Sequence, residues 1–153
     1  MIDAKRWKPE NSGASAYLRK GELLLHGSSI TQIGNFNCPP YRLLPCDIPD
    51  EQLGSLLLEI LAIAKTAPPP NDLKAQQQML FAAAKVKSWK QLNTAATNCC
   101  IFMTPADITV IPTRNEGRGF MHLPERNVKL PANCLPKDLG AALREGFSRC
   151  LKD

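Results

Sequence analysis

The chain has 153 residues, of which 44% are hydrophobic and 22% are charged, proportions that are typical of a globular protein and exclude a disordered one. No apolar run approaches the roughly 20 residues that would cross a bilayer, and no apolar segment follows the basic start. We therefore expect a protein without membrane contact that stays in the cytosol. The length predicts a polar lead-in over residues 1–16 and a single domain over residues 17–153.

The net charge of +5 permits contact with nucleic acid but does not require it. Basic residues occur along the whole chain, mixed with acidic ones, which favours a solvated basic surface. We recognise no export signal in the sequence, which argues against disulfides. The six cysteines also lack the Cys-x-x-Cys spacing of zinc sites. We expect reduced thiols, no metal and no cofactor, with Cys99 and Cys100 pointing to opposite faces of a strand.

The first part of the chain predicts a meander of short strands followed by a helix. Residues 11–15 have the composition of a loop, and the short apolar pieces after them lie at 17–18, 23–26, 29–33 and 41–45. Pro39 and Pro40 cannot donate to a ladder, so residues 34–40 are expected to be a loop. Pro49 and two acidic residues favour the start of a helix that ends near Lys65.

Two further helices are expected in the middle of the chain. The triple proline at 68–70 ends the first helix, and Asn71-Asp72 caps a second one that continues to Ala84. Ser88 begins a short third helix with Trp89 and Leu92 facing inward.

The last part of the chain predicts strands and a final helix. Residues 99–103 and 108–111 are the strongest strand signals, joined by a hairpin turn at 104–107. A polar loop over 113–119, short strands over 120–123 and 127–130, and a helix over 136–151 follow. The sum is an α+β domain with an antiparallel sheet and helices laid on one of its faces.

A repeat relates the two ends of the chain. The residues Leu44-Pro45, Leu53-Gly54, Leu57, Glu59 and Leu61 correspond to Leu130-Pro131, Leu139-Gly140, Leu143, Glu145 and Phe147, each pair 86 positions apart. This predicts pseudo-duplicated strand-helix halves, at about 17–67 and 97–153. A glycine within a helix costs about 1 kcal/mol relative to alanine. We expect close approach of each helix to an underlying strand to offset that cost.

No catalytic signature stands out. The chain lacks a nucleophile elbow, a phosphate-binding loop and a His-x-x-x-His pair. His26 and His122 alternate with apolar neighbours, which is typical of structural histidines at a sheet edge, although either could serve a cysteine as a base. Glu59 and Glu145 could meet as an acid-base pair, but their positions favour solvated charges. Tyr17, Tyr41 and Trp7 are either binding anchors or core residues.

Several segments, taken in order, resemble a known family. They are Val-Lys-Ser-Trp-Lys-Gln-Leu at 86–92, Ile-Thr-Val-Ile-Pro-Thr at 108–113, Gly-Phe at 119–120, Leu-Gly-Ala-Ala-Leu-Arg at 139–144, Ser-Arg-Cys at 148–150, and Asp-Glu-Gln-Leu-Gly at 50–54. In this order and spacing they are similar to the immunity proteins of contact-dependent growth inhibition systems.

The resemblance implies a cytosolic protein without catalysis. It would bind the C-terminal toxin domain delivered by a neighbouring cell, in many cases a nuclease, as a monomer or weak dimer without direct nucleic-acid contact. An inhibitor of a basic nuclease would present acidic surface. The chain is net positive, so an acidic patch is expected around Asp47, Asp50 and Glu51, or else the toxin is not strongly basic.

Partner choice is expected to lie in surface loops, which a rigid scaffold positions for recognition. The predicted contact residues are Asp107, Arg114, Glu116 and Arg118. Two alternatives remain open. One is a nucleic-acid-binding module that uses the basic surface, and the other is a small cysteine-dependent enzyme with one thiol of depressed pKa.

Overall fold

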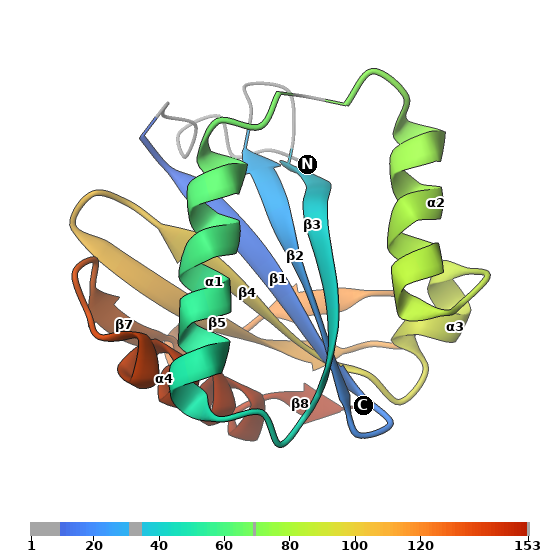
Figure 1. Cartoon of the computed structure of the whole chain (residues 1–153). Coiled ribbons are helices and arrows are strands. Elements are labelled where there is room, and N and C mark those ends of the chain that lie inside the picture. The colour runs from blue at the N-terminus through green and yellow to red at the C-terminus, as the bar shows by residue number, and fades with distance from the viewer. Residues whose placement is uncertain (1–9, 31–34, 69, 153) are drawn as a thin grey trace.

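The computed structural model describes residues 10–30, 35–68 and 70–152, and it confirms the predicted α+β class (Figure 1). The strands are β1 (Ser12–Arg19), β2 (Glu22–Ile30), β3 (Asn35–Pro45), β4 (Thr97–Met103), β5 (Asp107–Asn115), β6 (Phe120–His122), β7 (Val128–Pro131) and β8 (Leu151–Lys152). The helices are α1 (Asp50–Lys65), α2 (Leu73–Ala84), α3 (Trp89–Asn93) and α4 (Pro136–Ser148), with a 3-10 turn at Pro124–Arg126. Trp7 lies outside the described residues.

The strands form one eight-stranded sheet in the order β3-β2-β1-β4-β5-β6, with β7 and β8 also pairing with β5. Neighbouring strands are antiparallel, except that β8 runs parallel to β5 and places Leu151 opposite Arg114. The final helix therefore ends at Ser148, and Leu151 continues into the sheet rather than the helix. No helix within the described residues is long and apolar enough to cross a membrane.

Two predicted loops are strands. Residues 12–15, expected to be loop, belong to β1, which lies between β2 and β4 in the middle of the sheet. Their glycine, alanine and serine side chains resemble a loop in composition, but small side chains are what a strand covered on one face by a helix can accommodate. Residues 35–40, also expected to be loop, belong to β3. This strand is at the edge of the sheet, where proline is tolerated because no ladder bond is lost on the open side.

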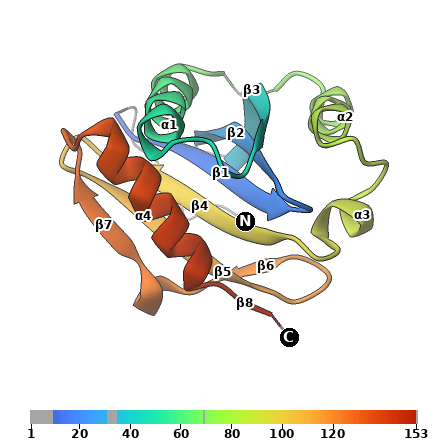
Figure 2. The same ribbon diagram turned by 60° about the horizontal axis from the view of Figure 1, so that its bottom comes forward.

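The helices cover both faces of the sheet, so the prediction that all of them lie on one face is wrong (Figure 2). Side chains along β2 alternate between the faces. Leu23 and Leu25 pack in the main core with α1 and α4, whereas Leu24 packs in a smaller cluster with Leu80 and Phe81 of α2. We call the face under α1 and α4 the closed face, and the opposite one, which α2 and α3 cover in part, the open face.

The two repeated glycines lie where α1 and α4 touch each other. A Cβ at Gly54 would overlap the backbone carbonyl of Pro136, and a Cβ at Gly140 would overlap that of Asp50. Each glycine thus meets the carbonyl four residues before the other. The predicted close approach exists, but its partner is the second helix and not an underlying strand.

The contact between α1 and α4 is also held by Arg144. Its Nε donates to Asp50 Oδ1 at 2.6 Å, and its terminal nitrogens donate to the carbonyls of Cys46 and Ile48. The neighbouring Glu145 is exposed and pairs with Arg149 at 3.0 Å.

The two ends of the chain follow the same order of elements. In each, three strands pair as an antiparallel meander and a helix follows, β1-β2-β3-α1 and β4-β5-β7-α4, and the first strands of the two meanders pair with each other. This arrangement agrees with the repeat in the sequence. A duplication of the halves stays a prediction, because similar topology alone does not show common origin.

Candidate functional site

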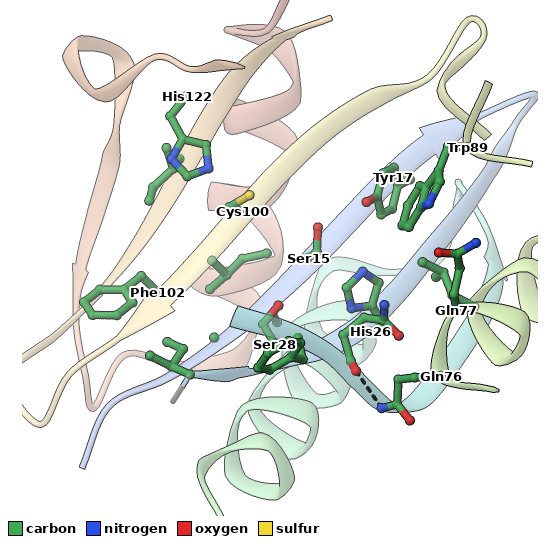
Figure 3. A pocket seen from close by; sticks show the side chains of 18 of the residues that line it. Ser15, Tyr17, His26, Ser28, Gln76, Gln77, Trp89, Cys100, Phe102 and His122 are labelled. Atoms are coloured by element: carbon green, nitrogen blue, oxygen red, sulfur yellow. Dashed lines mark hydrogen bonds between the residues drawn. The ribbon is translucent and has the colours of Figure 1, made fainter. Parts of the chain in front are cut away.

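A cavity of about 480 Å³ lies on the open face of the sheet, where α2 and α3 leave the strands uncovered (Figure 3). Its lining comes from β1, β2, β3, β4, β5 and β6 and from both helices. These elements are far apart in the sequence, so only the folded sheet brings the residues together. A largely preformed concave site of this size is the usual form of a binding site in a protein.

The floor of the cavity is a row of side chains across neighbouring strands. Ser15 of β1 lies opposite His26 of β2 on one side and opposite Cys100 of β4 on the other, and Cys100 lies opposite Ile111 of β5. Residues directly opposite in an antiparallel pair share a face. The alternation of apolar and polar residues along each strand indicates which side chains share a face. It does not indicate which strands pair, so the row could not be predicted from the sequence.

The walls of the cavity combine aromatic and aliphatic side chains with polar groups such as Ser15, Asn37 and Gln77. Tyr17, Phe36, Trp89 and Phe102 line it, and its described lining contains no Asp, Glu, Lys or Arg. Trp89, expected to face inward, is 41% exposed and packs edge-on against Phe81 at 5.1 Å between ring centroids. The surroundings therefore favour a neutral, partly apolar group over a charged one.

His26 is the buried polar group of the floor. The residue is 4% exposed, and β2 lies between β1 and β3, so the prediction of a histidine at the sheet edge is wrong for His26. Its Nδ1 lies 2.6 Å from the carbonyl oxygen of Gly27. Its Nε2 is buried and finds no hydrogen-bond partner among the described residues. Burial lowers the pKa of His26 to about 4, so the ring is neutral at pH 7.

Other polar groups around the floor are held in place by hydrogen bonds. Asn98 Nδ2 donates to Ser15 Oγ at 3.0 Å. Gln76 of α2 donates through Nε2 to the carbonyl of Asn37 at 2.6 Å, a bond that ties the helix to β3 and is drawn in Figure 3. Burial raises the pKa of Tyr17 to about 12, which keeps its hydroxyl protonated at pH 7. The rim of the cavity is therefore organised before any ligand arrives.

The cavity brings a thiol and two imidazoles into one lining, those of Cys100, His26 and His122. A general base is most effective when its pKa lies near the working pH. His26, with a pKa of about 4, is a weak base at pH 7. The described lining also contains no carboxylate to orient an imidazole. His26 is therefore poorly suited to activate Cys100.

The six cysteines are all free, as expected. Cys99 points into the closed-face core and Cys100 into the cavity, which confirms that the two adjacent side chains lie on opposite faces. Cys99 Sγ lies 3.7 Å from Cys150 Sγ, and the hydrogen bond between the two thiols lowers the pKa of Cys150. This thiol pair is on the closed face, whereas both histidines line the cavity. Within the described residues, no group of His, Cys, Asp or Glu side chains is arranged to hold a metal ion.

The four residues predicted to contact a partner do not form one patch. Asp107 begins β5 and pairs with Lys129 at 3.2 Å, whereas Arg114 is near the other end of the same strand. Seven steps of an extended strand separate them by about 23 Å. Glu116 and Arg118 are exposed in the loop between β5 and β6, close to Arg114. The structure therefore groups three of the four residues at the β5–β6 loop.

This loop adjoins the cavity through β6. His122 of β6 lines the cavity and pairs with Thr113, and the next pair along the hairpin joins Met121 to Arg114. Of the acidic residues expected to form a patch, Asp47 and Glu51 are exposed, whereas Asp50 is paired with Arg144.

Comparison with known proteins identifies the family. The sequence model of the CDI immunity protein family (CdiI) matches residues 37–150, about three-quarters of the chain. No curated protein matches.

Two solved structures are similar to this one. A protein of unknown function from Neisseria meningitidis, NMB0488, superposes with a TM-score of 0.78 at 18% identity, over 94% of this chain and 98% of that one. A chain of the CdiA-CT/CdiI toxin and immunity complex from Yersinia pseudotuberculosis superposes with a TM-score of 0.74 at 22% identity, over 92% of this chain and 97% of that one. At these identities the two structures show a shared fold. With the family match over residues 37–150, the chain belongs to the CDI immunity protein family, whose name refers to contact-dependent growth inhibition.

Proposed function

We propose that this protein is the immunity partner of one CDI toxin, binds the C-terminal domain of that toxin and blocks it by contact, without catalysing a reaction. The family match over residues 37–150 carries the proposal. The likeness to a chain of a toxin and immunity complex supports it at the level of the fold. We further propose that it acts in the cytoplasm as a monomer or weak dimer.

The open face is the proposed contact surface. It joins the cavity, through His122 of β6, to the β5–β6 loop, which carries the exposed charges of Glu116 and Arg118. Interfaces commonly combine a buried aromatic centre with a polar rim. Asp107, at the far end of β5, stays a separate prediction.

We propose that the toxin is a nuclease. The main alternative is that this protein itself binds nucleic acid, and the salt dependence of binding distinguishes the two. A protein that binds phosphates through Lys and Arg loses affinity steeply as salt rises. If the purified protein alone bound RNA or DNA with such a salt dependence, the nucleic-acid alternative would be favoured instead.

The test uses the toxin domain encoded next to the gene. Co-purification, a binding isotherm and loss of toxin activity on addition of the protein are the expected results. The double variant Glu116→Arg/Arg118→Glu reverses the loop charges, and Ser28→Trp fills the cavity with a large side chain. Each should weaken binding about 10-fold or more, because central contacts and charge complementarity both contribute to affinity.

The control is Glu59→Lys, a charge reversal at an exposed position of α1. It should bind like the wild type, since α1 covers the closed face. All variants should keep a thermal midpoint within a few degrees of the wild type. Unchanged affinity in both open-face variants would exclude this surface, and absence of any complex with the wild type would exclude the proposed function.

A further inference from the structure

We propose that His26 selects what enters the cavity, with its Nε2 accepting a hydrogen bond from an uncharged N–H or O–H group of the toxin. This inference rests on the proposed function, because it names the chemistry at one point of the same contact.

The geometry of the ring determines which nitrogen can accept. His26 Nδ1 lies 2.6 Å from the carbonyl oxygen of Gly27, and a carbonyl can only accept a hydrogen bond. Nδ1 therefore carries the proton. A neutral imidazole has one proton, so Nε2 is left with a lone pair. The low pKa that burial gives this ring agrees with the neutral form.

The lone pair on His26 Nε2 accepts no hydrogen bond from the described residues. It is buried, and no donor among them reaches it. Such an atom destabilises the free protein, because it has lost water without gaining another partner. His26 belongs to the lining of the cavity and is drawn among its side chains in Figure 3, so a group that enters the cavity and displaces the neighbouring side chains can bring a donor to Nε2.

The rest of the lining restricts the chemistry of that donor. The described lining has no Asp, Glu, Lys or Arg, so an ammonium, guanidinium or carboxylate would be buried there without a permanent counter-charge. Tyr17, Trp89 and Phe102 offer aromatic surface to an apolar group. The occupant that suits both features is a neutral side chain or backbone segment with an apolar body and one N–H or O–H, such as an indole, a phenol or an amide.

Three substitutions separate the acceptor from the ring. His26→Phe keeps an aromatic ring and removes both nitrogens. His26→Asn keeps an amide near the position of Nδ1, where it can donate to the Gly27 carbonyl. The asparagine side chain is too short to place an acceptor at the position of Nε2. His26→Gln places an amide oxygen near Nε2 and so retains an acceptor in the cavity. Affinity for the isolated toxin domain and thermal midpoints are measured for all four proteins.

We expect His26→Phe and His26→Asn to weaken binding roughly 10- to 100-fold, since the donor of the toxin is left unpaired on burial. His26→Gln should stay within about five-fold of the wild type. His26→Phe should also raise the thermal midpoint, because it removes the unpaired atom. Stability and affinity would then move in opposite directions, which a merely structural histidine would not produce.

The inference is overturned if folded His26→Asn or His26→Phe binds as tightly as the wild type, or if His26→Gln is as weak as His26→Asn. If the Phe variant does not fold, the Asn and Gln pair still decides the matter. A wild type that binds no toxin domain removes the proposed function itself, whereas a wild type that binds with unaffected variants removes only the role of His26.

Discussion

The two faces of the sheet differ in how completely the helices cover them. On the closed face, α1 and α4 bury a continuous apolar core and approach each other to backbone contact at Gly54 and Gly140. On the open face, α2 and α3 cover one side and leave an aromatic cavity with a buried acceptor at its floor. The closed face holds the main apolar core, whereas the open face keeps one buried acceptor, His26 Nε2, without a partner among the described residues. Substitutions should therefore affect folding on the first face and binding on the second.

The largest effect is expected at the contact between α1 and α4. Gly140→Ala would drive a methyl group into the Asp50 carbonyl, so the helices must separate. We expect a loss of about 3 kcal/mol or more in the free energy of unfolding, measured with urea. At an exposed helix position the same change would stabilise by about 1 kcal/mol. Gly119→Ala is the control, because a Cβ there meets nothing within 4 Å. Wild-type stability in Gly140→Ala would show that the helix pair is not tightly packed.

The second effect is the dependence of the free energy of unfolding on pH, which we expect His26 on the open face to cause. His26 has a pKa of about 4 in the folded protein and an ordinary value of 6.5 when exposed, so the unfolded chain binds the extra proton first as pH falls. Stability should be fully present above pH 6.5 and decrease by about 3 kcal/mol as pH falls to 4. Urea unfolding at pH 7 and pH 4 measures it. Because carboxylates also titrate in this range, the informative quantity is the difference from His26→Phe, which should lose correspondingly less. Parallel profiles would contradict a neutral buried His26.

The smallest effects are expected at two side chains that tie a helix to its neighbour by hydrogen bonds, one on each face of the sheet. Arg144 joins α4 to the start of α1 with bonds to Asp50 and two carbonyls, whereas Gln76 joins α2 to β3 with one bond to Asn37. We expect Arg144→Ala to reduce the free energy of unfolding by about 2 kcal/mol and Gln76→Ala by about 1 kcal/mol. Arg144→Lys should not rescue, since a single ammonium cannot reproduce the fork of donors. Equal losses at the two sites would remove the asymmetry between the faces.

The strongly patterned elements were predictable from the sequence. The α1 helix begins and ends where Pro49, the two acidic residues and Lys65 indicate, and the turn between β4 and β5 is where it was expected. Two strands, β1 and β3, were predicted to be loops because their glycine, serine and proline resemble loop composition. The position in the sheet explains why both segments are strands. β1 is paired on both sides, with β2 and β4, and β3 is an edge strand, where proline is tolerated. Local composition does not contain that information.

The cavity was beyond sequence reasoning for a different reason. Ser15, His26 and Cys100 become neighbours only through the register of three strands, and register depends on contacts between distant segments. The β5–β6 loop could be proposed because its charges are contiguous in the sequence. Asp107 was grouped with that loop although β5 holds it at the other end, which only the length of the strand reveals.

The paired glycines also limit how this family member can change. Because Gly54 and Gly140 each meet a backbone carbonyl of the other helix, sliding one helix by a single position would bring a leucine, a serine or an alanine onto that carbonyl. Insertions or deletions between either glycine and its preceding strand would therefore have to be absorbed in the connecting turn. Variation in length is expected to accumulate on the opposite side of the molecule, where the proposed contact surface can change without disturbing the helix pair.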